Sequence, residues 1–134
     1  MSIQIDEFSL AVSEILDGYA EDIQEAVAQA VEETGTKALK TVKAKSPVRK
    51  GKGGGRYKKG WRIKKERSGV LGTQAQVTVY NKTDGPLVHL LENGHQKAGG
   101  GRVEGIPHVR PAYEEAERLL PELTARAIEE AGER

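Results

Sequence analysis

Three side chains that could bind a metal recur at every third position: His89, Glu92 and His95. On a helix, each step of three residues turns the chain by about 300°, so these side chains spread around the cylinder. The zinc-binding pattern H-E-x-x-H instead puts its two histidines on one face, four residues apart. Gly94 also ends the predicted helix before His95, and His108 is remote in sequence. We therefore expect no metal and no other cofactor. A nuclease that binds a metal through His89, His95 and His108 is kept as the third hypothesis.

The residue types needed for covalent or acid–base catalysis are not arranged as a catalytic site. The chain has no cysteine, and no serine lies in a G-x-S-x-G turn. Glu114, Glu115 and Glu117 fall near a predicted helix start, where acids favour the helix dipole. The glycine run "GGGRVEG" lacks the G-K-[ST] ending of a phosphate-binding loop. We expect no catalytic residues, no small-molecule substrate and no enzymatic activity.

A basic segment is the best candidate for direct contact with a partner. Its cations are interleaved with Tyr57 and Trp61, as in segments that track phosphates; they are Arg49, Lys50, Lys52, Arg56, Lys58, Lys59 and Arg62. The alternatives are a solvated loop, or a loop that the acidic helix of a neighbouring copy holds in place. No element that could read bases is evident, so any nucleic-acid contact should be independent of sequence.

The net charge of +1 conceals a strong segregation of charge along the chain. Residues 1–36 hold nine acids and no Lys or Arg, whereas residues 37–67 hold fourteen bases and one acid. Residues 68–134 hold seven bases and ten acids. Such blocks predict contact with nucleic acid or between oppositely charged protein surfaces.

The elements that must position these residues follow from hydrophobic spacing. Steps of three and four residues predict a helix from Asp6 to about Lys45, with a kink or break at Gly35 and an end at Ser46-Pro47. Residues 46–60 are rich in glycine and charge, which indicates a flexible basic loop.

The remaining segments predict a hairpin followed by two helices. "WRIKKERS" and "AQVTVYN" alternate like paired antiparallel strands, and a third strand is expected at residues 70–71 or 103–106. A short helix should span Gly85 to Gly94 and a final helix Pro111 to about Gly132, kinked at Pro121. Residues 1–134 thus predict a single α+β domain, a small antiparallel sheet covered on one face by a long N-terminal helix and a C-terminal helix, with a short helix between.

The stretch "LVHLLENGHQKAGGGRVEGIPHVRPAYEEA" resembles the signature of tail-completion, or head–tail joining, proteins of long-tailed double-stranded DNA phages. The matching residues are Leu91, Glu92, Gly94, His95, Gly99, Gly100, Gly101, Pro107, His108, Arg110, Pro111 and Ala112. "AKSPVRKG…YKKGW" is similar to the junction after the first helix of that family, although the basic insert is longer here.

The resemblance implies a structural protein of the virion neck or upper tail, without catalytic residues. Its relatives form rings, typically sixfold, so the partners expected are copies of the same chain, the head connector or adaptor proteins and the tail tube protein. DNA passing along the ring axis could contact the basic loop. We expect assembly in the bacterial host cytoplasm, with no signal peptide and no membrane span.

Within the signature, glycines permit tight turns, and His95, His108 and Arg110 should hold the loop or a neighbour. An ion pair between Arg110 and Glu92 is expected. The main alternative, from another functional class, is a small DNA-binding accessory protein that uses residues 49–62 and binds without sequence preference.

Overall fold

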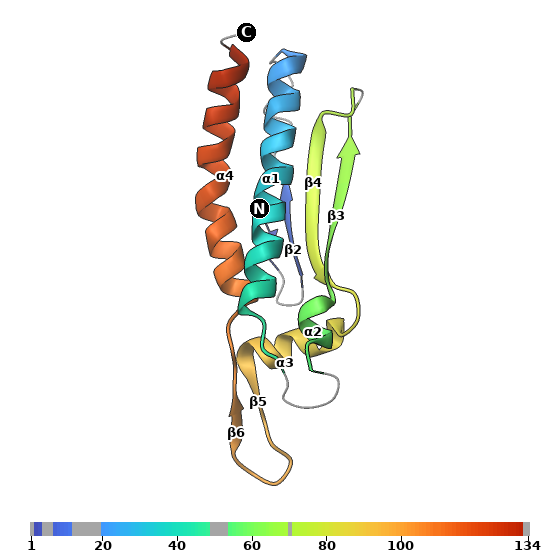
Figure 1. The fold of residues 1–134 in the computed structure, drawn as a ribbon, viewed down its shortest axis with the longest axis vertical. Coiled ribbons are helices and arrows are strands. Elements are labelled where there is room, and N and C mark those ends of the chain that lie inside the picture. Colours follow the sequence, from blue (N-terminus) through green and yellow to red (C-terminus); the bar gives the residue numbers. More distant parts are fainter. Residues whose placement is uncertain (1, 4–6, 12–19, 49–53, 70, 133–134) are drawn as a thin grey trace.

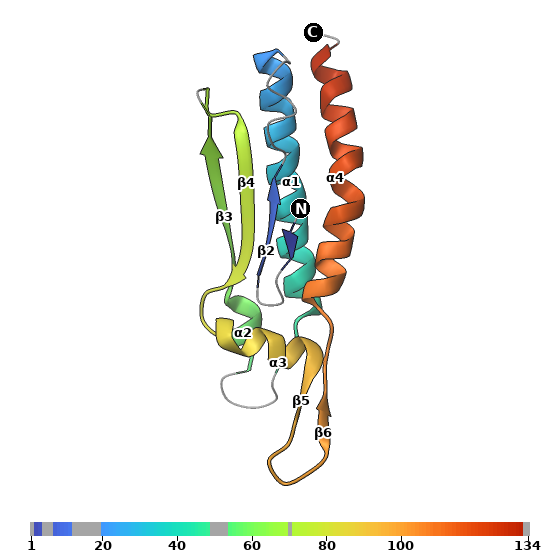
Figure 2. The ribbon, with the colours of Figure 1, turned by 180° about the vertical axis from the view of Figure 1, so that it is seen from behind.

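The computed structural model describes residues 2–3, 7–11, 20–48, 54–69 and 71–132. Two long helices lie side by side along a small sheet, and a thin hairpin projects from one end of the elongated body (Figures 1 and 2). The predicted α+β class is confirmed. Within the described residues, no helix has the length and apolar character needed to cross a membrane.

The sheet is antiparallel and has the strand order β1-β2-β4-β3. Its strands are β1 (Ser2–Ile3), β2 (Glu7–Ala11), β3 (Trp61–Ser68) and β4 (Gln74–Asn81). The predicted hairpin of β3 and β4 is confirmed. The prediction of a helix starting at Asp6 is wrong, because Glu7–Ala11 forms the third strand and pairs with β4. Leu71 and residues 103–106 do not join this sheet, although Val103 and Glu104 belong to a strand of a second, two-stranded sheet; Val70 lies outside the described residues.

Helix α1 (Glu21–Lys45) lies across the sheet and buries Val27, Ala28, Ala30, Val31, Thr34, Gly35, Ala38 and Val42. Gly35 neither kinks nor breaks it. A Cβ at Gly35 would lie 2.6 Å from Cγ2 of Val77, so the missing side chain allows α1 to approach β4 closely. The helix ends where predicted, at Ser46 before Pro47.

Short elements gather at the end of the body where α1 stops. They are α2 (Arg56–Lys59), the 3-10 turn η2 (Gly85–Leu87), α3 (Val88–Asn93), β5 (Gly94–Gln96) and β6 (Arg102–Glu104). Part of the segment predicted as a flexible loop, residues 56–59, is thus helical; its residues 49–53 lie outside the described ranges. The short helix before Gly94 is confirmed, and β5 pairs with β6 to form the projecting hairpin.

The last helix, α4 (Val109–Gly132), begins two residues before the predicted Pro111 and continues through Pro121. It packs along α1 and reaches β2, where the rings of Tyr113 and Phe8 meet edge to face at 6.0 Å. The core combines Phe8, Leu10, Val77 and Val79 from the sheet with the buried faces of both helices. Both long helices therefore cover the same face of the sheet.

Candidate interaction site

Glu92 of α3 caps the start of α4, an element that begins well beyond it in the sequence. Its Oε1 accepts the backbone N–H groups of His108 at 2.9 Å and Val109 at 2.8 Å, and its Oε2 accepts that of Arg110 at 3.0 Å. These N–H groups have no partner inside the helix, and a carboxylate also suits the positive end of the helix dipole. The expected ion pair between the side chains of Glu92 and Arg110 is wrong. Glu92 instead accepts the backbone N–H of Arg110, whose side chain is exposed.

The capping bonds keep Glu92 ionised although it is buried. Burial raises the pKa of this carboxyl, but the hydrogen bonds from the His108 ring and from the three backbone N–H groups outweigh burial and lower its pKa to about 2. The carboxylate therefore stays charged at neutral pH.

His108 connects this cap to an aromatic group, and its side chain is fully buried. Nδ1 of its ring lies 2.6 Å from the Ile106 carbonyl oxygen and 3.0 Å from Glu92 Oε1. Both neighbours are acceptors, so Nδ1 carries the proton and Nε2 accepts the Tyr57 O–H at 2.6 Å. Burial, followed by the negative charges of Glu92 and Asp84, raises the pKa of Tyr57, which keeps this donor protonated.

Three rings pack edge to face around that hydrogen bond. Tyr57 lies 5.8 Å from Trp61 and 5.5 Å from His108, and Trp61 lies 6.0 Å from His108. The indole N–H of Trp61 donates to Ser46 Oγ at 2.8 Å, which fixes the end of α1 to the start of β3. We call Ser46, Tyr57, Trp61, Glu92 and His108 the capping cluster. It joins α1, α2, β3, α3 and α4 at one corner.

A second polar network positions the residues beside the capping cluster. The Asn81 amide donates to the Tyr57 carbonyl oxygen at 2.8 Å, and Asn81 Oδ1 accepts the backbone N–H groups of Thr83 at 3.1 Å and Asp84 at 2.8 Å. Asp84 is thereby brought within 3.6 Å of Nε of Arg56. The turn at residues 81–84 thereby connects η2 to α2 through the Arg56–Asp84 ion pair.

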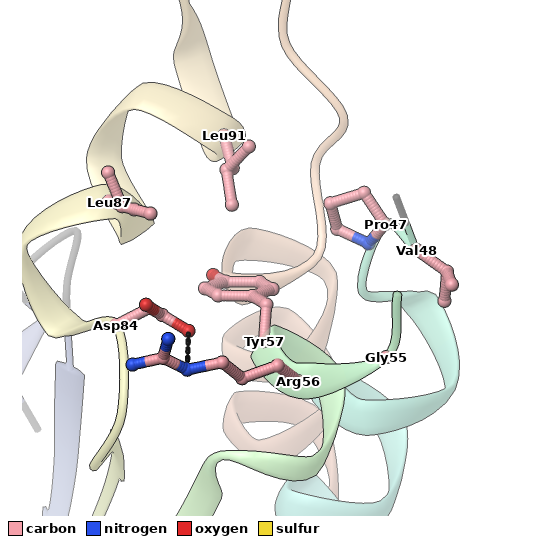
Figure 3. Close-up of a pocket in the computed structure, with 8 residues that line it drawn as sticks. All are labelled: Pro47, Val48, Gly55, Arg56, Tyr57, Asp84, Leu87 and Leu91. Carbon is pink, nitrogen blue, oxygen red and sulfur yellow. Dashed lines mark ion pairs between the residues drawn. The ribbon is translucent and has the colours of Figure 1, made fainter. Parts of the chain in front are cut away.

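A pocket of about 380 Å³ opens between these elements (Figure 3). Leu87 and Leu91 lie on one side, Pro47 and Val48 lie on the other, and the Tyr57 ring lies between them. Gly55 and the Arg56–Asp84 ion pair complete the lining. The walls are mainly apolar, with charge confined to the ion pair, which suits an apolar side chain with a polar neighbour. Hydrophobic spacing could not predict this pocket, because its lining comes from three separate segments of the chain.

The glycine-rich part of the signature forms the projecting hairpin. At its base a Cβ on Gly94 would lie 2.3 Å from the Val103 carbonyl oxygen, so only glycine fits. At its tip Gly100 and Gly101 have φ values of 98° and 82°, which favour glycine. Gly99, Gly100 and Gly101 are exposed, and His95 is half-buried within β5. The glycines of the hairpin are therefore needed for its backbone conformation, at the base for close packing and at the tip for positive φ values.

The signature residues therefore fall into two groups, those that hold the corner together and those that lie at the surface. Glu92, Gly94 and His108 hold the corner together, whereas Pro107 and Arg110 are exposed and Pro111 is half-buried at the start of α4. Within the signature, the Glu92 carboxylate and the His108 ring contact one another directly, with Oε1 3.0 Å from Nδ1.

Two of the four basic candidates that the structure describes make contacts within the chain. Arg56 pairs with Asp84, and the Arg62 guanidinium donates to the carbonyl oxygens of Lys59 and Trp61. Lys59 is exposed and Lys58 is half-buried. Arg49, Lys50 and Lys52 lie outside the described residues.

The segregated charges meet partly within one chain. Arg67 of β3 donates to Glu25 at 2.7 Å and to Glu32 at 2.9 Å, both on α1. The hydrogen bonds from Arg67 lower the pKa of Glu25 and Glu32, against the opposing effect of burial. The sequence indicated two complementary blocks, but it did not show that one subunit satisfies part of that complementarity itself.

Across the described part of the chain, no three His, Asp or Glu side chains gather closely enough to hold a metal ion. His108 is buried in the capping cluster, whereas His89 is exposed and His95 is half-buried. The structure does not assemble the three histidines considered from the sequence.

Comparison with known proteins supplies one match. Residues 11–94 match the model of a family described as "Bacteriophage HK97-gp10, putative tail-component". No curated protein and no solved structure matches. The matched residues include α1, the hairpin of β3 and β4, and α3 up to Gly94; the glycine-rich hairpin and α4 lie beyond them.

Proposed function

Because the chain belongs to the HK97-gp10-like family of bacteriophage tail components, we propose that it is a structural virion protein that forms a ring at the head–tail interface or in the upper tail. The family match over residues 11–94 is the observation that carries this proposal. In this reading the protein joins the tail to the DNA-filled head, and its partners are further copies, head connector or adaptor proteins and the tail tube protein.

The shape and charge of the subunit support the proposal. A ring is built by repeating one heterologous contact, which needs two different complementary surfaces on every subunit. Helix α1 has acids in its first turn, Glu21 and Asp22, and bases in its last turn, Lys43 and Lys45. The two ends of α1 thus differ in charge, which suits contact between unlike surfaces.

The test combines electron microscopy with measurement of assembly state. Particles made without the protein should contain filled heads and separate tails, and the intact gene supplied in trans should restore joined particles. Native mass spectrometry of the complex recovered from particles should give a closed ring, six subunits being the expected number. Normal tailed particles in the absence of the protein would overturn the proposal.

The alternative, a DNA-binding accessory protein using residues 49–62, finds less support in the described cations. Two of them, Arg56 and Arg62, are occupied by contacts within the chain. Filter binding at two salt concentrations separates the two functions. Tight binding by the isolated monomer that weakens steeply with salt would favour the accessory protein.

A further inference from the structure

We infer that the pocket between Tyr57, Leu87 and Val48 binds an acidic peptide segment of a different virion protein, with one apolar side chain inserted beside Tyr57. This inference deepens the proposed function, on which it depends, by assigning one contact of the tail component to a defined surface.

The apolar character of the pocket indicates an apolar side chain in the occupant. Val48 and Leu87 are 54% and 45% exposed, although they line a concave site rather than an open surface. Leu87, Leu91 and Pro47 face the Tyr57 ring from both sides (Figure 3). A leucine-sized side chain would cover the exposed apolar atoms on both walls at once.

The charges around the pocket indicate that the segment carrying this side chain is acidic. The only carboxylate in the lining, Asp84, is already paired with Arg56 at 3.6 Å. Lys58 and Lys59 continue α2 from Arg56 and add positive charge. A carboxylate beside the inserted side chain would therefore be attracted, and an ammonium repelled.

A second copy of this chain is a poorer occupant. Among the described residues, three other large apolar side chains are exposed: Leu71, Val103 and Ile106. Leu71 lies in a neutral turn, Val103 lies between Arg102 and Glu104, and Ile106 lies between Gly105 and Pro107. None combines an apolar side chain with net negative charge in its immediate neighbours.

The experiment is photo-cross-linking in assembled particles, with p-benzoylphenylalanine replacing Leu87 and the linked peptide identified by mass spectrometry. The control places the same group at Leu71, which is also exposed, at 57%, but lies in the distant turn between β3 and β4. We expect Leu87, and not Leu71, to link to a segment of another virion protein that has net negative charge and an apolar residue. Linkage to a copy of this chain, to a basic or neutral segment, or to nothing would overturn the inference.

A matched pair of substitutions measures the effect on assembly. Leu87→Asp would place a charge against apolar walls and should reduce incorporation into particles by about tenfold or more, whereas Leu71→Asp should not. Circular dichroism confirms that both variants fold. Equal incorporation of both folded variants would contradict the inference alone. Absence of the wild-type chain from particles would instead contradict the proposed function.

Discussion

Glu92 holds His108 at two points: its Oε1 accepts the backbone N–H at 2.9 Å and lies 3.0 Å from Nδ1 of the ring. One carboxylate thus fixes both the first turn of α4 and the orientation of the imidazole that accepts the Tyr57 hydroxyl. The relationship connects the short helix α3, the long helix α4 and the wall of the pocket. The Tyr57 ring in the wall of the pocket is thus connected to Glu92 through His108.

Replacing Glu92 by Gln should lower the free energy of unfolding by about 2–3 kcal/mol, because hydrogen bonds to a buried charge are lost. Both carboxylate oxygens accept backbone N–H groups, whereas an amide offers one oxygen and turns an NH2 group toward the N–H of His108 or Arg110. Urea denaturation at pH 7 measures the change. The control, Glu122→Gln on the exposed side of α4, should change the stability by less than about 0.5 kcal/mol. Equal effects of the two substitutions would contradict the capping role.

The same carboxylate should make stability depend on acid pH. Its pKa is about 2 in the folded protein and 4.5 in the reference state, so its stabilising contribution is complete above pH 4.5 and is lost as the pH falls toward 2. The full contribution is about 3 kcal/mol, at about 1.4 kcal/mol per unit of pKa. We expect the difference between the wild type and Glu92→Gln to shrink over this range in urea titrations. A difference that stays constant from pH 7 to pH 2.5 would contradict the lowered pKa.

Part of this corner could be anticipated from the sequence, and part could not. The resemblance singled out Glu92 and His108, but hydrophobic spacing gave no reason to join them. One signal was available: the residues before α4, Ile106, Pro107 and His108, include no Ser, Thr, Asp or Asn to cap it. A long helix without a local cap indicates that a cap comes from elsewhere in the chain.

The N-terminal strand shows a different limit of sequence reasoning. Phe8 and Leu10 alternate as strand residues do, yet Phe8 also lies four residues before Val12 and eight before Leu16, which fits the spacing of the predicted helix. Pairing of Phe8 with Val79 decides between the two, and that partner lies far along the chain. The hairpin of β3 and β4 was predictable because its strands are long, alternating and adjacent in sequence.

Gly35→Ala tests the close contact between α1 and the sheet. Alanine favours a helix by about 1 kcal/mol over glycine, so propensity alone predicts a more stable protein. The added methyl group would lie 2.6 Å from Cγ2 of Val77, and we expect this overlap to prevail, with a net loss of about 1–3 kcal/mol. Gly132→Ala is the matched control, since no atom lies within 4 Å of its added Cβ. Thermal unfolding measures the stability of both variants. A Gly35→Ala variant more stable than the wild type would contradict the close contact between α1 and Val77.

Arg67→Gln tests the charge contact within the chain. Its guanidinium joins Glu25 and Glu32, but 29% of the Arg67 side chain remains exposed. Solvent screening therefore limits the expected loss to about 1 kcal/mol, and added salt should reduce it further. Lys64→Gln removes a longer, exposed pair with Glu66, at 3.8 Å, and should have almost no effect. Denaturation at low and high salt makes the comparison; a loss independent of salt would show that packing, not charge, is responsible.

Tyr57→Phe separates the stability of the corner from the function proposed for its pocket. The substitution removes the O–H that donates to Nε2 of His108 at 2.6 Å, so a buried acceptor loses its partner and stability should fall by about 1–2 kcal/mol. The ring still lines the pocket, so cross-linking from position 87 should continue at a temperature where the variant is folded. Leu87→Asp should behave in the opposite way, with stability within about 0.5 kcal/mol of the wild type and impaired incorporation into particles. If Tyr57→Phe abolished the cross-link while remaining folded, the hydroxyl and not the apolar walls would be the group that recognises the partner.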